Sequence, residues 1–335
     1  MFTHKIKSFS VLSLFHFGFF DLLLWIQRQR IVILMYHRFS KNPEPFKITE
    51  KIFDRQLTYL NKKFSIISLN DYVSVLSGEK KSLPPNPLIL TIDDGYQDNY
   101  HYAYPILKKH KTPATIFLTT DFINQRAWLW SNKLEYILKN SRLKKFTFPI
   151  AGIEQPFNVG TFQEWHRSQL GIFNYCRLIN NKDRETLLDE LASYLHVKVS
   201  EVVTDEFSPL TWDQIRLMQA HGIEYGSHTC SHPICSKLAP DELYHELEDS
   251  KKEIEKQIDA QVDLFCYPNG QPNDISDDVV QQLKKSGYKA AVTTFTGYNS
   301  KNETDHFRLK RMSFSKANYS ELLRELTRIQ VKTSK

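Results

Sequence analysis

Short apolar runs that alternate with helical patterns constrain the fold of this chain more than any other feature. These runs predict eight strands, at residues 31–37, 64–69, 87–93, 113–119, 223–228, 262–268, 289–294 and 308–314. They are nearly continuous in hydrophobicity, as in strands that are covered on both faces. Several intervening segments carry apolar residues three and four positions apart, which is typical of amphipathic helices. The pattern predicts an α/β protein with a parallel sheet, either open or closed into a barrel.

Residues 124–208 interrupt this alternation. They contain helical patterns such as WSNKLEYILKN and RETLLDELASYL, and no convincing series of strands. No Pro/Gly-rich linker borders the interval, so we predict a helical insertion within one domain that spans residues 31–330. The insertion either shapes a substrate groove or adds bulk to the flank of the sheet.

The charge and cysteine content exclude some classes of function. The net charge is +6, but Lys and Arg are interspersed with acidic residues, and no basic-aromatic motif is present. This distribution argues against nucleic-acid binding. Four irregularly spaced cysteines, with no Cys-x-x-Cys pair, do not form a disulfide framework.

The N-terminal stretch VLSLFHFGFFDLLLWI (residues 11–26) is strongly apolar. It is shorter than the roughly 18–20 residues needed to span a bilayer, and it contains His16 and Asp21. Basic residues flank it, and no small-residue cleavage site follows. We predict that residues 1–30 form a hydrophobic helix that holds the protein at a membrane of the cell envelope through residues 9–27. Packing of this helix on the domain is the alternative.

Polar side chains collect where four of the predicted strands end. In α/β barrels these carboxyl ends share one rim, where functional residues gather. The residues expected at this rim are His37, Asp93, Asp94, His228, His232 and the turn Pro268-Asn269-Gly270.

Two histidines and one carboxylate form a common catalytic zinc set that leaves a position open for water. His228 and His232 would share a face if the segment after the strand were helical. Of Asp93 and Asp94, one could bind the ion while the other takes a proton from the activated water. Each motif alone has an ordinary explanation, such as a turn for Asp-Asp-Gly, but their joint occurrence at strand ends favours a metal site.

The segments TIDDG (91–95), HTCSH (228–232) and YPNG (267–270) resemble the motifs of carbohydrate esterase family 4, the polysaccharide deacetylases with a NodB-like domain. The segments ILMYH (33–37) and LTWDQIRLMQAHGIEYGSHT (210–229) resemble the branch related to exopolysaccharide deacetylases. The resemblance extends from residue 31 to about residue 315.

This resemblance implies a distorted (β/α)7 barrel that removes N- or O-acetyl groups from sugars. Asp93 would be the general base, and Asp94, His228 and His232 would bind a divalent metal, by default zinc. Metal-activated water would attack the acetyl carbonyl, with the oxyanion held by the metal and the Asn269 N–H. The substrate or oxyanion contacts expected from the third motif are Tyr267, Pro268, Asn269 and Gly270.

Three departures from the family pattern are visible. Cys266 occupies the position of an Arg that normally orients the base, and Asn269 replaces an aromatic residue. The late Leu-x-x-His, whose histidine acts as the general acid, has no counterpart. His37 or His306 would then protonate the leaving amine, and we favour His37 because its strand end faces the metal.

The leading hypothesis is therefore a metal-dependent hydrolase that removes N-acetyl groups from amino sugars of an envelope or exported polysaccharide. The apolar N-terminus suggests an alternative, a deacylase of a lipid-linked amino sugar or other small amide. The missing Arg and late His suggest another, a non-catalytic glycan-binding protein on the same fold.

Overall fold

One parallel sheet organises the protein, for which a computed structural model describes residues 25–26, 28–203 and 205–313. Each of the eight predicted runs contains one of its strands, so the predicted parallel α/β sheet is confirmed. In sheet order the strands are β11 (Ala290–Val292), β10 (Leu264–Cys266), β9 (Ile223–Ser227), β6 (Ala114–Leu118), β5 (Pro87–Ile92), β1 (Val32–Tyr36) and β12 (Met312–Ser313), with β4 (Ser65–Ile66) paired to β5 beside this path.

The chain segment 309–313 pairs with β11 at one end of the sheet and with β1 near the other end. The Leu309 N–H donates to the Ala291 carbonyl (3.0 Å), and the Thr293 N–H donates to the Leu309 carbonyl (2.8 Å). A few residues later β12 pairs with β1, with Met312 opposite Leu34. The sheet is therefore curled, an arrangement consistent with the distorted (β/α)7 barrel that was expected.

Both faces of the sheet are buried, which explains the continuous apolar runs. Along β1, Val32, Leu34 and Tyr36 belong to one apolar cluster. Ile33 belongs to a second cluster on the opposite face, together with Ile89 and other strand residues. Successive side chains of a strand point to opposite faces, so a strand between two apolar layers must be apolar throughout.

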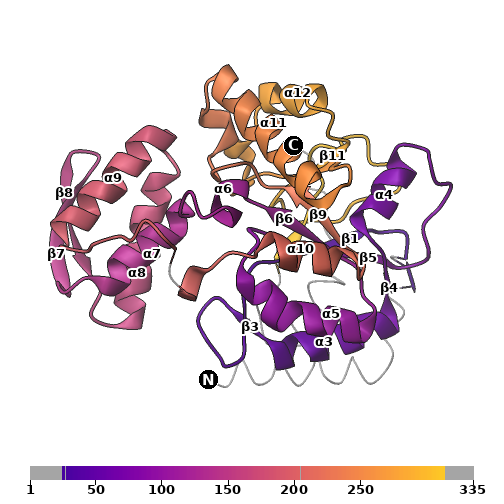
Figure 1. Ribbon diagram of the computed structural model, residues 1–335, viewed down its shortest axis with the longest axis horizontal. Helices are drawn as coiled ribbons and strands as arrows, with labels where there is room; N and C mark the ends of the chain where they lie inside the picture. The colour runs from indigo at the N-terminus through magenta and orange to yellow at the C-terminus, as the bar shows by residue number, and fades with distance from the viewer. Residues whose placement is uncertain (1–24, 27, 204, 314–335) are drawn as a thin grey trace.

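Helices cover the sheet and lie above and below its strands in Figure 1. α3 and α5 lie on the lower side of that view, and α11 and α12 on the upper side. Within residues 28–313, the α-helices outside the insertion are α3 (Glu50–Lys63), α4 (Leu69–Leu76), α5 (Tyr104–His110), α6 (Thr120–Ile123), α10 (Trp212–Gln219), α11 (Pro240–Ile258) and α12 (Asp277–Lys285). Two-residue strands β2 (Phe39–Ser40) and β3 (Ile48–Thr49) pair beside the rim.

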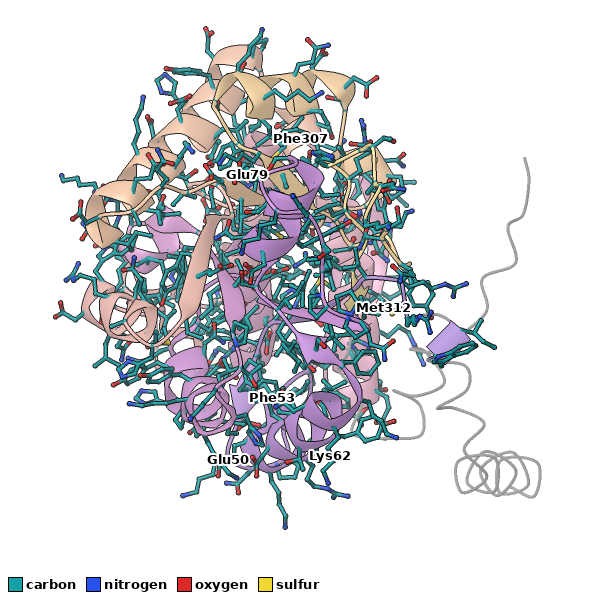
Figure 2. All side chains as sticks on the ribbon, turned by 90° about the vertical axis from the view of Figure 1, so that its right-hand side faces the viewer. Glu50, Phe53, Lys62, Glu79, Phe307 and Met312 are labelled. Carbon is teal, nitrogen blue, oxygen red and sulfur yellow. The ribbon has the colours of Figure 1, made fainter. Side chains whose placement is uncertain are left out.

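Helix α3 shows how local sequence sets these elements. The Thr49 side chain accepts the Ile52 N–H and caps the helix, and Lys62 lies in its last turn, where a cation is favourable. Phe53 is fully buried. Figure 2 shows Phe53 on the inner side of α3, whereas Glu50 and Lys62 lie at the outer edge of the molecule.

The insertion differs from the sequence prediction in one respect. Besides α7 (Trp130–Asn140), α8 (Phe162–Cys176) and α9 (Asn181–Tyr194), it contains an antiparallel hairpin of β7 (Lys145–Ile150) and β8 (Ile153–Asn158). The prediction that this interval lacks paired strands was therefore wrong. Ala151 and Gly152 both have positive φ and form the two-residue turn. Each strand contains a proline, a residue that argues against a strand when only the sequence is read.

Residues 130–195, called the inserted lobe below, share an apolar cluster of their own. It contains Leu134, Ile172 and Leu188, all fully buried. Figure 1 shows the lobe at the left of the view, beside the rim of the sheet. The predicted domain boundaries at residues 30 and 330 and the limits of the insertion at 124 and 208 stay predictions.

The predicted N-terminal hydrophobic helix falls almost wholly outside the described residues. Trp25 and Ile26 are described, and both side chains are exposed. In the described part of the chain, no helix combines the length and hydrophobicity needed to cross a bilayer.

Candidate metal centre and active-site cleft

Asp93 and Asp94 follow β5 in a tight turn at the rim of the sheet. The Asp93 N–H donates to the Tyr36 carbonyl (3.0 Å), which continues the pairing with β1 for one residue. Asp94 has a φ of 78° and Gly95 a φ of 85°. A side chain at Gly95 would be strained by this φ and would meet the Ile123 side chain at 2.9 Å. Because of this turn, the two carboxylates point in different directions and contact different partners.

Asp94 meets the two histidines of the second motif. Its Oδ1 lies 3.5 Å from His228 Nε2 and 3.5 Å from His232 Nε2, and all three residues are buried. Ligand atoms around a tetrahedral ion lie about 3.4 Å apart when each bond is about 2.1 Å long. The spacing and the donor set therefore fit a divalent metal, and the structure brings together the three ligands expected from the sequence.

The histidines approach each other through a loop, not through a helical turn. Thr229 and His232 have φ values of 70° and 61°, so the expectation of a shared helical face was wrong. The Thr229 hydroxyl accepts the His232 N–H (3.0 Å). Glu246 of α11 accepts the N–H groups of Cys230 (2.7 Å) and Ser231 (3.0 Å). These hydrogen bonds, instead of the hydrogen bonds of a helix, fix the conformation of the loop.

Each imidazole presents its Nε2 to the site. His228 Nδ1 lies 2.6 Å from the Cys266 carbonyl, so it carries the proton and leaves Nε2 free to bind a metal. Burial and the neighbouring His228 lower the pKa of His232 to about 3. His232 is therefore neutral near neutral pH, the form in which imidazole binds metals.

Asp93 is held by Arg311, which the sequence analysis did not select. Two parallel hydrogen bonds join them, from Nη1 to Oδ1 (2.7 Å) and from Nη2 to Oδ2 (2.8 Å). Both side chains are buried, and Arg311 Nε donates to the Thr293 carbonyl (2.8 Å). Burial raises the pKa of Asp93, but the charge and hydrogen bonds of Arg311 outweigh it and lower that pKa below its usual value. Asp93 is consequently ionised and fixed in orientation.

Arg311 takes the place of the Arg that is missing from the third motif at Cys266. The Cys266 Sγ lies 3.1 Å from Arg311 Nη2, so the guanidinium fills the space beside the cysteine. Asp93, His228 and Cys266 also lie close enough to hold a metal, but Arg311 already binds two members of this cluster. Arg311 stands beside two other basic residues, Arg308 and Lys310, so its residue type gave no distinguishing signal in the sequence. The missing Arg consequently gives no support to a non-catalytic protein.

His37 faces Asp93 across the opening of the site. Its Nε2 lies 3.7 Å from Asp93 Oδ2, and its side chain is 44% exposed, which leaves it open to a substrate. His306 is not among the residues that line the cleft, and its carbonyl accepts the Ala291 N–H (2.9 Å) within the sheet. The geometry favours His37 over His306 as the group beside the reacting atoms.

A cleft of about 390 Å³ opens over these residues. The rim and the inserted lobe both line it. From the rim come His37, Asp93, Asp94, His228, His232, Tyr267 and Asn269, and from the lobe come Ser131, Asn132, Glu135, Gln169 and Phe173. Pro268 and Gly270 shape the third-motif turn, in which the Gly270 N–H donates to the Pro268 carbonyl (2.7 Å). The predicted roles of Tyr267, Pro268, Asn269 and Gly270 toward substrate stay predictions.

Residues 80–291, more than half of the chain, match the family described as polysaccharide deacetylase. The chain belongs to this family. The family expected from the motifs is thus confirmed, and the protein is a deacetylase of the hydrolase class.

Two curated relatives are similar in sequence. The Bacillus subtilis (strain 168) protein named "Putative polysaccharide deacetylase YxkH" is 23% identical over 287 residues, which cover 84% of this chain and 72% of that protein. The poly-β-1,6-N-acetyl-D-glucosamine N-deacetylase of Staphylococcus epidermidis (strain ATCC 35984 and its synonyms) is 32% identical over 87 residues, or 25% of this chain and 29% of that protein.

Two solved structures share the fold. The Streptococcus pyogenes deacetylase PplD, in complex with acetate, aligns with a TM-score of 0.56 at 22% identity, over 85% of this chain and 92% of that chain. IcaB from Ammonifex degensii aligns with a TM-score of 0.56 at 17% identity, over 89% of this chain and 96% of that chain.

Proposed function

We propose that this polysaccharide deacetylase removes N-acetyl groups from amino sugars of an envelope or exported polysaccharide. One observation carries the proposal: the Asp94–His228–His232 set lies beside Asp93, which Arg311 holds ionised, and His37 faces Asp93 across the opening. The name of the Staphylococcus epidermidis relative makes polymers of N-acetylglucosamine the first substrates to test.

Asp93 and His37 divide the proton transfers. Asp93 takes a proton from the attacking water, whose oxygen forms a bond to the acetyl carbon. The carbon–nitrogen bond then breaks, and the leaving nitrogen receives a proton from His37, which yields acetate and a free amine. Because the lowered pKa keeps Asp93 ionised, the base can accept a proton whenever substrate arrives.

Asp94, His228 and His232 would hold the divalent metal, for which zinc is the first expectation. When bound, the metal supplies Lewis-acid chemistry, which activates water and stabilises the negative charge that develops on the acetyl oxygen. The backbone N–H of Asn269, at the edge of the cleft, would be a second donor to that oxygen.

Acetate release from N-acetylated glycans tests this function. We expect the wild-type protein to release acetate, a chelator to stop release, and added zinc to restore it. The Asp93→Asn and His228→Ala variants should be nearly inactive. Release by both variants at the wild-type rate would contradict the mechanism.

We also propose that residues 9–27 hold the protein at a membrane surface, so that the cleft acts close to the cell envelope. Support comes from the apolar sequence of this segment and its basic flanks. Co-sedimentation with anionic phospholipid vesicles should be strong for the full chain and weak for a chain that lacks residues 1–30. Equal sedimentation of the two proteins would refute membrane binding by this segment.

A further inference from the structure

The catalytic cleft continues into a second hollow that no step of the proposed reaction uses. This hollow measures about 330 Å³, within the size range of ligand sites. It shares Pro45, Phe46, Lys47 and Glu135 with the cleft over the metal ligands. Its far side is formed by the inserted lobe, including Phe162 and Trp165. A chain-like ligand in the cleft can therefore extend into it.

Two exposed aromatic rings meet at this junction. Phe46, on the loop between β2 and β3, is 55% exposed, and Phe162, at the start of α8, is 50% exposed. Their ring centroids lie 6.3 Å apart, and the Phe162 ring is parallel to that of His166 within 5°. Large exposed aromatic side chains that cluster beside a cleft are typical of ligand contacts.

Phe46 occupies a left-handed backbone position that a turn of this kind usually fills with glycine. Phe46 has a φ of 62° and follows Pro45, in a turn whose Lys47 N–H donates to the Glu44 carbonyl (3.4 Å). Glycine is favoured at such a position, and a bulky residue there is uncommon. Strain of this kind is concentrated at functional sites. Here it presents the Phe46 ring to the hollow.

The charges of the hollow indicate an uncharged ligand. Three lysines and three glutamates line it, so their charges cancel. Lys47 pairs with Glu44 (2.7 Å), and Lys139 pairs with both Glu135 (2.7 Å) and Glu206 (2.5 Å). Lys144, the third lysine, donates to the Ser141 carbonyl (3.3 Å). Sugar hydroxyls can hydrogen-bond to the paired groups without breaking their ion pairs.

Two polar donors along the same wall lack partners within the described residues. Asn132, 4% exposed, lines the catalytic cleft, and its Oδ1 accepts the Tyr96 hydroxyl (3.0 Å) while its Nδ2 has no partner. Trp165, 7% exposed, lines the hollow, and its Nε1 also has no partner. Buried donors are normally paired, so both N–H groups are suited to donate to a ligand oxygen.

We propose that the inserted lobe and the loop 41–47 bind a second, uncharged sugar unit of the same glycan chain. Phe46 and Phe162 are its stacking surface, and Asn132 and Trp165 donate hydrogen bonds along the path from the reacting unit. This site rests on the deacetylase function proposed above, and it makes the enzyme selective for chains over single sugars.

Substrate length tests this site. Acetate release is compared for N-acetylglucosamine and for a tetramer of β-1,6-linked N-acetylglucosamine. In Phe162→Ala, the KM for the tetramer should rise roughly tenfold, since an aromatic contact contributes about this factor. The kcat/KM for the single sugar should stay within about twofold. Phe162→Tyr keeps the ring and should restore the KM, and Tyr244→Ala, an exposed aromatic on α11, is the matched control.

The Phe46→Gly variant distinguishes a loss of glycan binding from a loss of folding stability. It removes the ring but suits the backbone, so the KM for the tetramer should rise while the melting temperature is unchanged or higher. An unchanged KM for the tetramer in Phe162→Ala, or equal losses on both substrates, would overturn the site.

Calorimetric titration of the tetramer keeps the two proposals apart. If the wild-type protein binds the tetramer more tightly than Phe162→Ala but releases no acetate, the proposed N-deacetylation of this glycan fails and the second site stands. Equal affinity of the two proteins would overturn the second site, whatever the activity.

Discussion

The rim of the sheet and the inserted lobe face each other across one cleft, but different forces hold them. At the rim, buried charged and polar groups pair with one another, as in Asp93 with Arg311 and Asp94 with His228 and His232. The lobe is held by apolar packing among residues 130–195, and polar and aromatic side chains lie on its cleft wall.

In the proposed function, the rim carries out the reaction and the lobe recognises the substrate. Removing the partner of a buried charge destabilises the folded protein by several kcal/mol. We therefore expect the rim to tolerate few substitutions. The lobe can change the side chains on its wall while its own core stays packed. We therefore expect substitutions at the rim to reduce the rate on every substrate, and substitutions on the lobe to alter which substrate is used.

The largest effect is expected from loss of a metal ligand. His228→Ala should lower acetate release by roughly 10³-fold or more, because Lewis-acid stabilisation contributes several kcal/mol. The purified variant should also lose bound metal, as measured by elemental analysis. Asp93→Asn is the matched control, since it should be slow but retain metal. Metal retained at wild-type stoichiometry in His228→Ala would contradict the assignment of this ligand.

A smaller effect is expected from loss of His37, the proposed proton donor. His37→Asn should lower kcat by about 10²-fold with little change in KM, since general acid catalysis contributes at least this factor. The measurement is steady-state acetate release. His306→Asn is the matched control and should behave as the wild type. The reverse result would assign the general acid to His306.

Arg311 tests whether the rim depends on its buried ion pair. Arg311→Met leaves the Asp93 carboxylate buried without its partner, so the free energy of unfolding should fall by about 3–5 kcal/mol. Activity should fall by roughly 10- to 100-fold, because a displaced base loses its alignment. Urea unfolding and acetate release measure the two effects. Arg311→Lys retains the charge but not the paired hydrogen bonds, and should lie between the wild type and Arg311→Met.

The smallest effect on chemistry is expected from the core of the lobe. Leu188 is fully buried there, and Leu188→Ala should lower the stability of the lobe by about 2–5 kcal/mol. Acetate release from a single sugar should stay within about twofold of the wild-type rate. Thermal unfolding and acetate release check both statements, with the 72%-exposed Leu178 replaced by Ala as control. A large loss on the single sugar would show that the rim depends on the lobe.

The sequence was sufficient for the sheet and for the candidate metal set. Strands buried on both faces must be apolar throughout, so their runs were visible one by one, and parallel strands place their carboxyl ends on the same rim. Asp94 and His228 could therefore be placed together although 134 positions separate them. The loop at 229–232 and the hairpin of the lobe were missed, because positive φ at Thr229 or Ala151 has no clear signal in those residue types.

Only the tertiary structure identified Arg311 and the cleft. Arg311 reaches Asp93 because the sheet curls until the chain near residue 309 pairs with β11 and β12 pairs with β1. Local patterns report burial and periodicity, but they carry no information on which distant segment closes a sheet. The same holds for Phe46 and Phe162, which share a hollow only because the inserted lobe lies against the loop 41–47. Contacts between segments far apart in the chain thus decided how Asp93 is held and where the proposed second sugar site lies.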